Sequence, residues 1–251
     1  MNTYRKHYEE CRRNFGCNKT DISNLKIERN FEKSGKYFDL INSLKTKAEK
    51  HFEDKQNCFV DDFRIGVKDA SIFPEVHMIH EYFYQQIANR FFSSNYTSNR
   101  IQICKSLPSE AELFDQWIWH YDDVSNYHVK FFVYLSNIES SKDGAFCHAA
   151  DELGNPVRIR ISKFEPQKRI KQIFENSRVP QDYILSNNFK EKYITGNMGE
   201  CFLFSPNIIH KAIVPEEGHH RMVLIYHYHP ATIKTKLFNF VGPGFKDYRL
   251  I

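Results

Sequence analysis

The sequence predicts a single domain that is mainly β, with helices flanking a β core. The chain has 251 residues and a mass of 29.9 kDa, a size that one β-sandwich or barrel with a sizeable core can reach. Aromatic residues make up 15% of it, with 22 Phe and 14 Tyr, and flat side chains of this kind fill packed β cores. The spacing of apolar residues changes from helical to alternating near Arg100. We therefore expect a mainly helical part over 1–99, the β core over 100–230 and a C-terminal extension over 231–251.

The amino-acid composition argues against several classes of protein. The net charge of +4 arises from 35 basic and 31 acidic residues spread along the chain, without the basic stripe of a nucleic-acid binder. The six cysteines form no C-x-x-C pair, which argues against a zinc knuckle or a thioredoxin-like motif and fits a reduced compartment. The N-terminus has no apolar segment of the secretory kind, and no apolar run has the length of a membrane span. We expect a cytoplasmic protein with no nucleic-acid or membrane partner, and leave the oligomeric state open.

The first part of the chain contains one clear amphipathic stripe. Its apolar residues recur at helical spacing: Tyr37, Phe38, Leu40, Ile41, Leu44 and Ala48. This pattern predicts a helix that packs on the core. The segment 2–15 has weaker periodicity, and a helix or a mobile arm fits it equally well.

A second helix is predicted from Pro74 onward. Proline is tolerated in a first helical turn, and apolar residues follow at every third or fourth position, namely Val76, Ile79, Phe83, Ile87 and Phe91. His77 and His80 lie one turn apart on this helix and could form a metal pair. No carboxylate or third ligand accompanies them, so a solvated or hydrogen-bonded helix face is expected instead.

The β core begins where alternation begins. Strands are predicted over 118–122, Val129 to Ile138, Phe189 to Ile194 and Glu200 to Phe204, with a helical insertion over 167–176. A hairpin is predicted from Ile208 to Val214 and Met222 to Tyr228 around the turn 215–218. In the predicted strand from Val129 to Ile138, one face is apolar and contains Val129, Phe131, Val133 and Leu135. The other face, with Lys130, Phe132, Tyr134 and Ser136, is expected to line a wet cavity.

His120 and Asp122 are the first candidate metal ligands. Residues two apart on a strand leave the same face, so both side chains can enter one cavity, while Trp117, Trp119 and Tyr121 face the core. A third ligand must come from elsewhere in the sequence, and His210 begins the best later strand. Two imidazoles and one carboxylate on one side of a metal suit a non-haem ferrous ion with open positions, at which catalysis would take place.

Arg221 is the candidate anchor for an acidic ligand. If the loop 215–218 closes a regular hairpin, Arg221 pairs with Ala212, which shares its face with His210. The guanidinium would then enter the same cavity, where its planar fork matches a carboxylate with two parallel hydrogen bonds. A dicarboxylate that bridges the metal and Arg221 would neutralise both.

At this point the sequence resembles the Fe(II)- and 2-oxoglutarate-dependent oxygenases, and among them it is similar to the phytanoyl-CoA dioxygenase-like group. The resemblance rests on His120-Tyr121-Asp122, the strand 199–204, His210, and Arg221 eleven positions later, and it spans about Arg100 to Pro230. Relatives often carry Pro-Gly-Ser-His where this chain has Phe146-Cys147-His148-Ala149, and a small hydroxylated residue at Ala212. The departures remove no ligand, but they prevent any transfer of substrate.

The resemblance implies a double-stranded β-helix of the jelly-roll or cupin-like kind. It implies iron held by His120, Asp122 and His210, and 2-oxoglutarate whose far carboxylate binds Arg221. Gln102 matches a cosubstrate-contacting position, and Lys130 and Tyr134 are weaker candidates for the same role. The implied reaction consumes O2 and 2-oxoglutarate, releases succinate and CO2, and hydroxylates a C–H bond of a small molecule.

Two rival functions stay open. A cupin-like metalloenzyme would use the same three ligands without 2-oxoglutarate and would tolerate Arg221→Ala. A non-catalytic barrel would bind a ligand or partner and keep the triad as a relic, and it would form no succinate and contain no metal when freshly purified.

Other histidines and the C-terminal run give weaker predictions. His227 and His229 are expected to be packing or rim residues because no acid lies near them in sequence, and His219 and His220 are expected to be exposed. Cys147 and His148 are adjacent on a predicted strand and so point to opposite sides, which argues against a nucleophile and base. The run from Thr232 could form a lid or pack at an edge.

Overall fold

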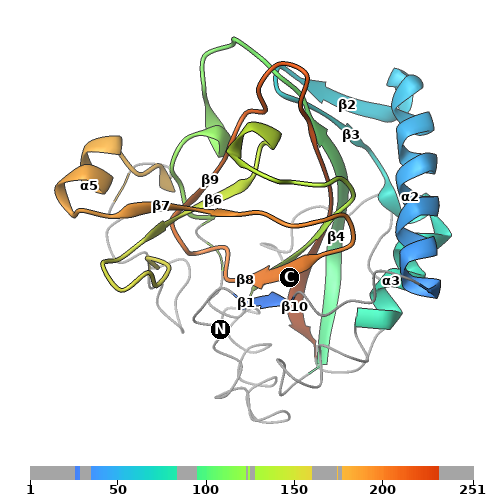
Figure 1. The fold of residues 1–251 in the computed structure, drawn as a ribbon. Coiled ribbons are helices and arrows are strands. Elements are labelled where there is room, and N and C mark those ends of the chain that lie inside the picture. Colours follow the sequence, from blue (N-terminus) through green and yellow to red (C-terminus); the bar gives the residue numbers. More distant parts are fainter. Residues whose placement is uncertain are drawn as a thin grey trace, which may run out of the picture.

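Two facing β-sheets form the centre of the molecule (Figure 1). The computed structural model describes residues 26–28, 35–83, 95–122, 124, 128–159, 174 and 177–231. The seven-stranded sheet has the order β1-β8-β5-β10-β4-β3-β2, and the three-stranded sheet has the order β7-β6-β9. The large sheet contains β1 (Lys26–Glu28), β2 (Cys58–Asp61), β3 (Arg64–Val67), β4 (Asn95–Ser106), β5 (Val129–Tyr134), β8 (Cys201–Phe204) and β10 (Arg221–Ala231). The small sheet contains β6 (Phe146–Ala150), β7 (Lys190–Ile194) and β9 (His210–Ala212).

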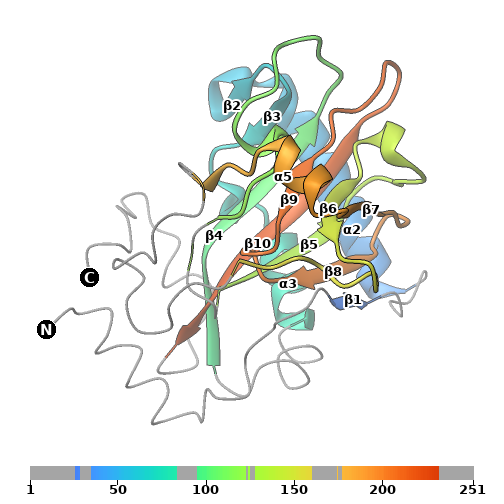
Figure 2. The same ribbon diagram turned by 90° about the vertical axis from the view of Figure 1, so that its left-hand side faces the viewer.

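The chain alternates between the two sheets from β5 onward. It passes from β5 in the large sheet to β6 and β7 in the small one, then to β8, β9 and β10 in turn. All the strand pairs among the described residues are antiparallel, and β4, β10 and β5 run side by side in Figure 2. This is the double-stranded β-helix that the sequence predicts, and the mainly β class with flanking helices is confirmed.

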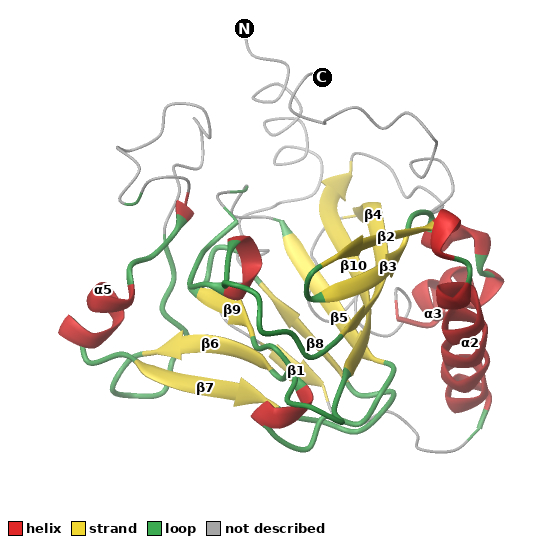
Figure 3. Ribbon diagram, turned by 90° about the horizontal axis from the view of Figure 1, so that it is seen from above, coloured by secondary structure: helices red, strands yellow, loops and turns green. Residues whose placement is uncertain are grey.

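Two helices cover the outer face of the large sheet, α2 (Lys36–Glu53) and α3 (Pro74–Phe83) (Figure 3). The predicted stripe of α2 is buried at Tyr37, Ile41, Leu44 and Ala48, together with Phe52. These side chains pack with alternate residues of the sheet, among them Ile103, Phe131, Val133, Leu224 and Tyr226. The helix from Pro74 is confirmed as far as Phe83, and its predicted continuation to Phe91 lies outside the described residues.

The two histidines of α3 are buried and hydrogen-bonded. His77 Nε2 lies 2.9 Å from the Ser71 carbonyl oxygen, and His80 Nδ1 lies 2.8 Å from the Tyr228 hydroxyl. Burial lowers the pKa of His77. Both residues therefore serve packing, and His80 links the helix to β10.

Between the sheets the interior is largely aromatic. Phe132, Phe146, Phe202 and Phe204 form a buried cluster with ring centroids 4.6 to 5.9 Å apart. The prediction of a wet cavity along Lys130, Phe132 and Tyr134 is therefore wrong for most of that face. Only Lys130, at one end, belongs to a polar environment, because the small sheet seals the other two side chains.

The predicted hairpin of β9 and β10 is wrong. β9 pairs with β6 in the small sheet, whereas β10 pairs with β4 and β5 in the large one. Arg221 consequently lies opposite Ser106, not Ala212, because residues 213–220 cross from one sheet to the other. A loop of this length can either close a hairpin or bridge two sheets, and its sequence does not distinguish the two.

Other elements agree with the sequence to different degrees. The predicted strands over 189–194 and 200–204 are found as β7 and β8, whereas β2 and β3 are not predicted. The predicted strand over 118–122 is an extended segment with isolated bridges, preceded by the short turn η5 (Asp115–Trp117). The remaining short elements are η2 (Lys55–Asn57), η3 (Ala70–Ile72), η6 (Ser141–Asp143) and α5 (Gln181–Ser186).

Three predicted segments fall outside the described part of the chain. They are 2–15, most of the helical insertion over 167–176, and the C-terminal run from Thr232. Among the described helices, none combines the length and the apolar character that a membrane crossing requires.

Candidate metal centre

Three polar side chains converge at one end of the space between the sheets. His120, Asp122 and His210 each offer one ligand atom, and these atoms all lie within 4.8 Å of one another. Asp122 Oδ1 is 3.6 Å from His120 Nε2 and 3.8 Å from His210 Nε2. These separations are too long for hydrogen bonds, but one ion between the three atoms could bind them all.

Backbone pairing holds the two histidines side by side. The His120 N–H donates to the His210 carbonyl at 2.9 Å, and the His210 N–H donates back to His120 at 2.8 Å. Partners in an antiparallel bridge share a face, so both imidazoles leave on the same side. Their ring centroids are 4.2 Å apart.

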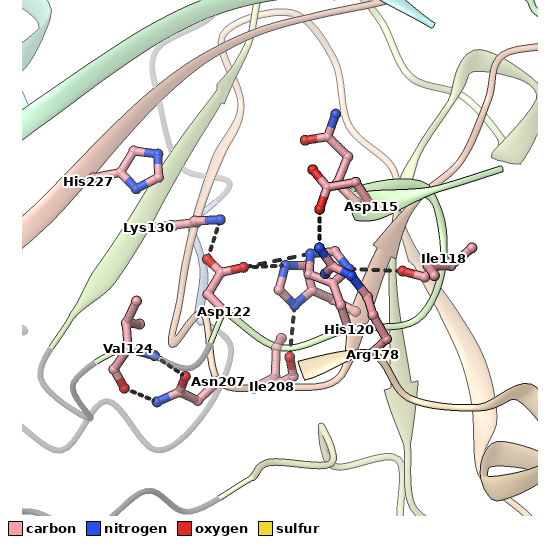
Figure 4. A network of polar contacts seen from close by, with 12 residues as sticks. Asp115, Ile118, His120, Asp122, Val124, Lys130, Arg178, Asn207, Ile208 and His227 are labelled. Atoms are coloured by element: carbon pink, nitrogen blue, oxygen red, sulfur yellow. Dashed lines mark hydrogen bonds and ion pairs between the residues drawn. The ribbon is translucent and has the colours of Figure 1, made fainter. Parts of the chain in front are cut away.

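Asp122 is fixed by the same pair of segments. Its backbone N–H donates to the Pro206 carbonyl at 2.9 Å. Beyond it, the buried Asn207 side chain accepts from Val124 N–H at 3.1 Å and donates to the Val124 carbonyl at 2.6 Å (Figure 4). Residues 120–124 and 206–210 are therefore joined at three successive points, which brings ligands far apart in sequence to one place.

The tautomer of both histidines is set locally. His120 Nδ1 lies 2.9 Å from the Ile118 carbonyl oxygen, and His210 Nδ1 lies 2.8 Å from the Ile208 carbonyl oxygen. A carbonyl can only accept, so Nδ1 carries the proton in each ring and the Nε2 lone pair faces Asp122. Burial lowers the pKa of His120 and lowers that of His210 further, which keeps both rings neutral. Neutral imidazoles with free Nε2 lone pairs are the form that binds metals.

Lys130 of β5 neutralises Asp122. Its ammonium contacts Asp122 Oδ2, which leaves Oδ1 toward the histidines (Figure 4). Burial by itself would raise the pKa of Asp122, but the charge of Lys130 and its hydrogen bond outweigh burial and hold that pKa well below its ordinary value. This favours the ionised form of the carboxylate.

The donor set fits a divalent transition metal. Two neutral imidazole nitrogens and one carboxylate oxygen on a single side are the facial arrangement of non-haem ferrous centres, which leaves other positions of the ion open. The backbone carbonyls behind each Nδ1 supply the supporting hydrogen bonds that such ligands usually have.

Gln102 is linked to the surroundings of this centre by a hydrogen bond with His227. On β10, His227 is opposite Lys130 of β5 on one side and Arg100 of β4 on the other. Its Nε2 lies 3.0 Å from Gln102 Oε1. His227 is buried, so of the two roles expected for it, packing and rim, the structure gives it an interior position beside Lys130.

Arg221 is buried on the same face of the large sheet as Gln102 and His227, but it lies far from them along the strand. It lies six positions before His227 on β10, which is about 20 Å along the strand at ~3.3 Å per residue. Its Nη2 donates to Ser106 Oγ at 3.2 Å, and among the described residues Nε has no hydrogen-bond partner. Burial lowers the pKa of the guanidinium. A buried cation with no carboxylate beside it is available to a bound anion.

The sequence reasoning missed two neighbours of the triad. Arg178 pairs with His120 on the side opposite His210, and His148 of β6 pairs with His210. Spacing in the sequence offers no signal for Arg178, because no alternating apolar pattern surrounds it. The sequence gives His148 no role at the metal centre, and in the structure its Nδ1 lies 3.2 Å from the Ala149 carbonyl oxygen.

No protein-family model matches the sequence, and no curated protein matches it. Solved structures do share its fold. HygX from Streptomyces hygroscopicus, with nickel, 2-oxoglutarate and hygromycin B bound, has 14% identity and a TM-score of 0.51, with 83% of each chain covered. SnoK, a non-heme alpha ketoglutarate dependent carbocyclase from nogalamycin biosynthesis, has 11% identity and a TM-score of 0.59, covering 90% of this chain and 83% of SnoK. EctD from S. alaskensis, with bound Fe, has 13% identity and a TM-score of 0.50, covering 87% of this chain and 76% of EctD.

Proposed function

We propose that the protein is an Fe(II)- and 2-oxoglutarate-dependent oxygenase that hydroxylates a C–H bond of a small molecule. The observation that carries the proposal is the convergence of two neutral imidazole nitrogens and one ionised carboxylate on a single point. The shared fold supports it, since HygX was solved with 2-oxoglutarate and a metal, and SnoK is described as alpha ketoglutarate dependent. The likeness to the phytanoyl-CoA dioxygenase-like group remains a prediction from the sequence.

The residues of the triad would hold the metal. His120 and His210 would bind through Nε2, and Asp122 through Oδ1, while Lys130 keeps the second carboxylate oxygen occupied. The bound iron supplies the activation of dioxygen, with conversion of 2-oxoglutarate to succinate and carbon dioxide. The chain itself orients the reactants and excludes water, which the aromatic cluster beside His210 does on one side.

The cosubstrate would lie along the inner face of the large sheet, between the triad and Arg221. Arg221 is the one buried guanidinium on that face among the described residues, and it can take a carboxylate with two parallel hydrogen bonds. Gln102, oriented by His227, and Lys130 are further cosubstrate contacts in this proposal.

The test separates binding from turnover. Protein purified without oxygen is titrated with Fe(II) and then with 2-oxoglutarate by calorimetry under nitrogen. In air, the loaded protein is given a panel of small molecules, and succinate and oxidised product are quantified. We expect 2-oxoglutarate to bind only after the metal, and succinate formation to rise with a true substrate.

Variants identify the site and the rival functions. Asp122→Ala should lose metal binding and succinate formation, whereas Asp182→Ala, at an exposed aspartate of α5, should retain both. A protein that binds metal but no 2-oxoglutarate would be a cupin-like metalloenzyme. A protein that binds neither would be a non-catalytic barrel, and either outcome rejects the proposal.

A further inference from the structure

Arg178 belongs to a row of side chains that crosses the metal centre. His148 of β6 is paired with His210 of β9, and isolated bridges pair His210 with His120 and His120 with Arg178. Two further hydrogen bonds hold the last pair, from Tyr121 N–H to the Ser177 carbonyl at 3.2 Å and from Val179 N–H to the Trp119 carbonyl at 2.8 Å. Partners in an antiparallel bridge share a face. The Arg178 side chain therefore leaves on the face from which His120 points toward the metal.

The Arg178 guanidinium stands at the solvent side of the centre. Its side chain is 34% exposed, and its backbone is paired with that of His120. Its Nη2 donates to Asp115 Oδ1, the one partner of this side chain among the described residues (Figure 4). Since a guanidinium has five N–H donors in a planar fork, one edge stays available for a ligand.

The backbone on both sides of this pair is held in an unfavourable conformation. Asp115 has φ 50° and Ser177, which precedes Arg178, has φ 63°. Left-handed backbone is uncommon for residues other than glycine and recurs at functional sites. Asp115 and Ser177 are two of only three such residues in the described chain. The fold thus accepts strain at both ends of the Arg178–Asp115 pair.

Among the described residues, the charges around the loaded centre sum to one positive charge, a statement that rests on the proposed function. A ferrous ion, Asp122, the 2-oxoglutarate dianion and Arg221 together carry no net charge. The Arg178–Asp115 pair is also neutral, so the remaining positive charge is that of Lys130, which keeps its contact with Asp122 Oδ2. An anionic substrate would restore neutrality.

We propose that the organic substrate carries an oxyanion group, a carboxylate or a phosphate, and that Arg178, oriented by Asp115, binds it beside the metal. The free edge of the guanidinium takes the oxyanion, while Lys130 on the opposite side of the triad adds its field. The oxidised carbon then lies within a few bonds of the charged group, because Arg178 is the immediate neighbour of the ligand His120.

The experiment uses the Fe(II)- and 2-oxoglutarate-loaded protein under nitrogen, so that no turnover is needed. Its melting temperature is measured with matched pairs of probes, namely small carboxylic acids with their primary amides, and phosphate monoesters with their parent alcohols. Saturating 2-oxoglutarate occupies Arg221, so the acid probes cannot raise the melting temperature by binding there. We expect at least one anionic probe to raise the melting temperature where its neutral partner does not. A response to the acids identifies a carboxylate as the group that binds, and a response to the phosphate monoesters identifies a phosphate.

Variants then locate the effect. Arg178→Gln should lower the affinity for the anionic probe at least about tenfold, because one or two charge-assisted hydrogen bonds are lost. Arg178→Lys should restore part of this affinity. Lys142→Gln, which removes a more exposed cation from η6, should have no effect. Affinity for 2-oxoglutarate should stay within about twofold in all three variants.

Several outcomes would overturn the proposal. They are an equal response to both members of every pair, no response to any anion, or an unchanged response in Arg178→Gln. A loss of 2-oxoglutarate affinity in that variant would assign Arg178 to the cosubstrate instead. If the wild-type protein binds no 2-oxoglutarate at all, the proposed function itself fails, which is a separate result.

Discussion

Lys130 on β5 contacts the carboxylate of Asp122, so the acidic member of the triad already has a cationic partner when no metal is considered. Both side chains are largely buried, with 16% and 18% of their surface exposed. Removal of one partner from such a pair leaves the other charge desolvated and uncompensated. The pair therefore matters most to the metal-free protein.

We predict that Lys130→Met lowers the free energy of unfolding of the metal-free protein by about 2 kcal/mol. The loss should shrink when a divalent metal is bound, because the metal then compensates Asp122. Urea unfolding with and without metal measures both values. Lys142→Met, which breaks an exposed pair with Glu216, should cost less than about 0.5 kcal/mol and serves as the control. An equal loss with and without metal would contradict the prediction.

Asn207 provides a test of how the ligands are positioned. Its side chain makes two hydrogen bonds to Val124, and it is fully buried. We predict that Asn207→Ala costs about 2 to 3 kcal/mol of stability and weakens metal binding by about tenfold or more, because the segment of Asp122 loses its tie to the segment of His210. Asn197→Ala, at an exposed turn, should change neither quantity appreciably. Metal titration by calorimetry decides the second part, and unchanged affinity would show that Asp122 is held by other contacts.

Arg221 should reveal a conflict between stability and ligand binding. Its guanidinium is buried, with one hydrogen bond to Ser106. We predict that Arg221→Met raises the free energy of unfolding of the ligand-free protein by about 1 kcal/mol, because an apolar side chain replaces an uncompensated buried charge. The same variant should lose 2-oxoglutarate binding at least a hundredfold while it keeps its metal, since two charge-assisted hydrogen bonds disappear. Arg221→Met that is destabilised, or that binds 2-oxoglutarate normally, would refute this assignment.

The buried histidines predict a pH dependence of stability. Burial lowers the pKa of His210, so the folded protein keeps this ring neutral where the unfolded chain binds a proton, below about pH 6.5. Stability should thus be complete above pH 6.5 and fall as the pH decreases toward 5, with up to about 1.4 kcal/mol lost per pH unit from one such group. Urea unfolding of the metal-free protein at pH 7.5, 6.5 and 5.5 measures the slope. His210→Gln should reduce the slope, and an identical slope in the variant would be inconsistent with a neutral His210.

Much of the candidate site can be read from local sequence. The alternation of His120 and Asp122 places both on one face of any extended segment, whether or not that segment is a regular strand. The Tyr37, Ile41, Leu44 and Ala48 stripe likewise specifies the buried side of α2. In both cases the relevant geometry repeats within a few residues, so side-chain periodicity suffices.

Only the tertiary structure decided which segments became neighbours. It placed Arg221 beside Ser106 and not Ala212, and Arg178 beside His120. Residues 213–220 could connect two strands of one sheet or of two different sheets. The outcome depends on which strands pair with β9 and β10, and in this fold they are β6 for β9 and β4 and β5 for β10. Pairing between strands is set by burial and by hydrogen bonds over the whole sheet, at sequence separations where a local pattern carries no information. The sequence by itself therefore determined the candidate ligands of the proposed metal centre, and the assembled sheets determined which cations lie near them.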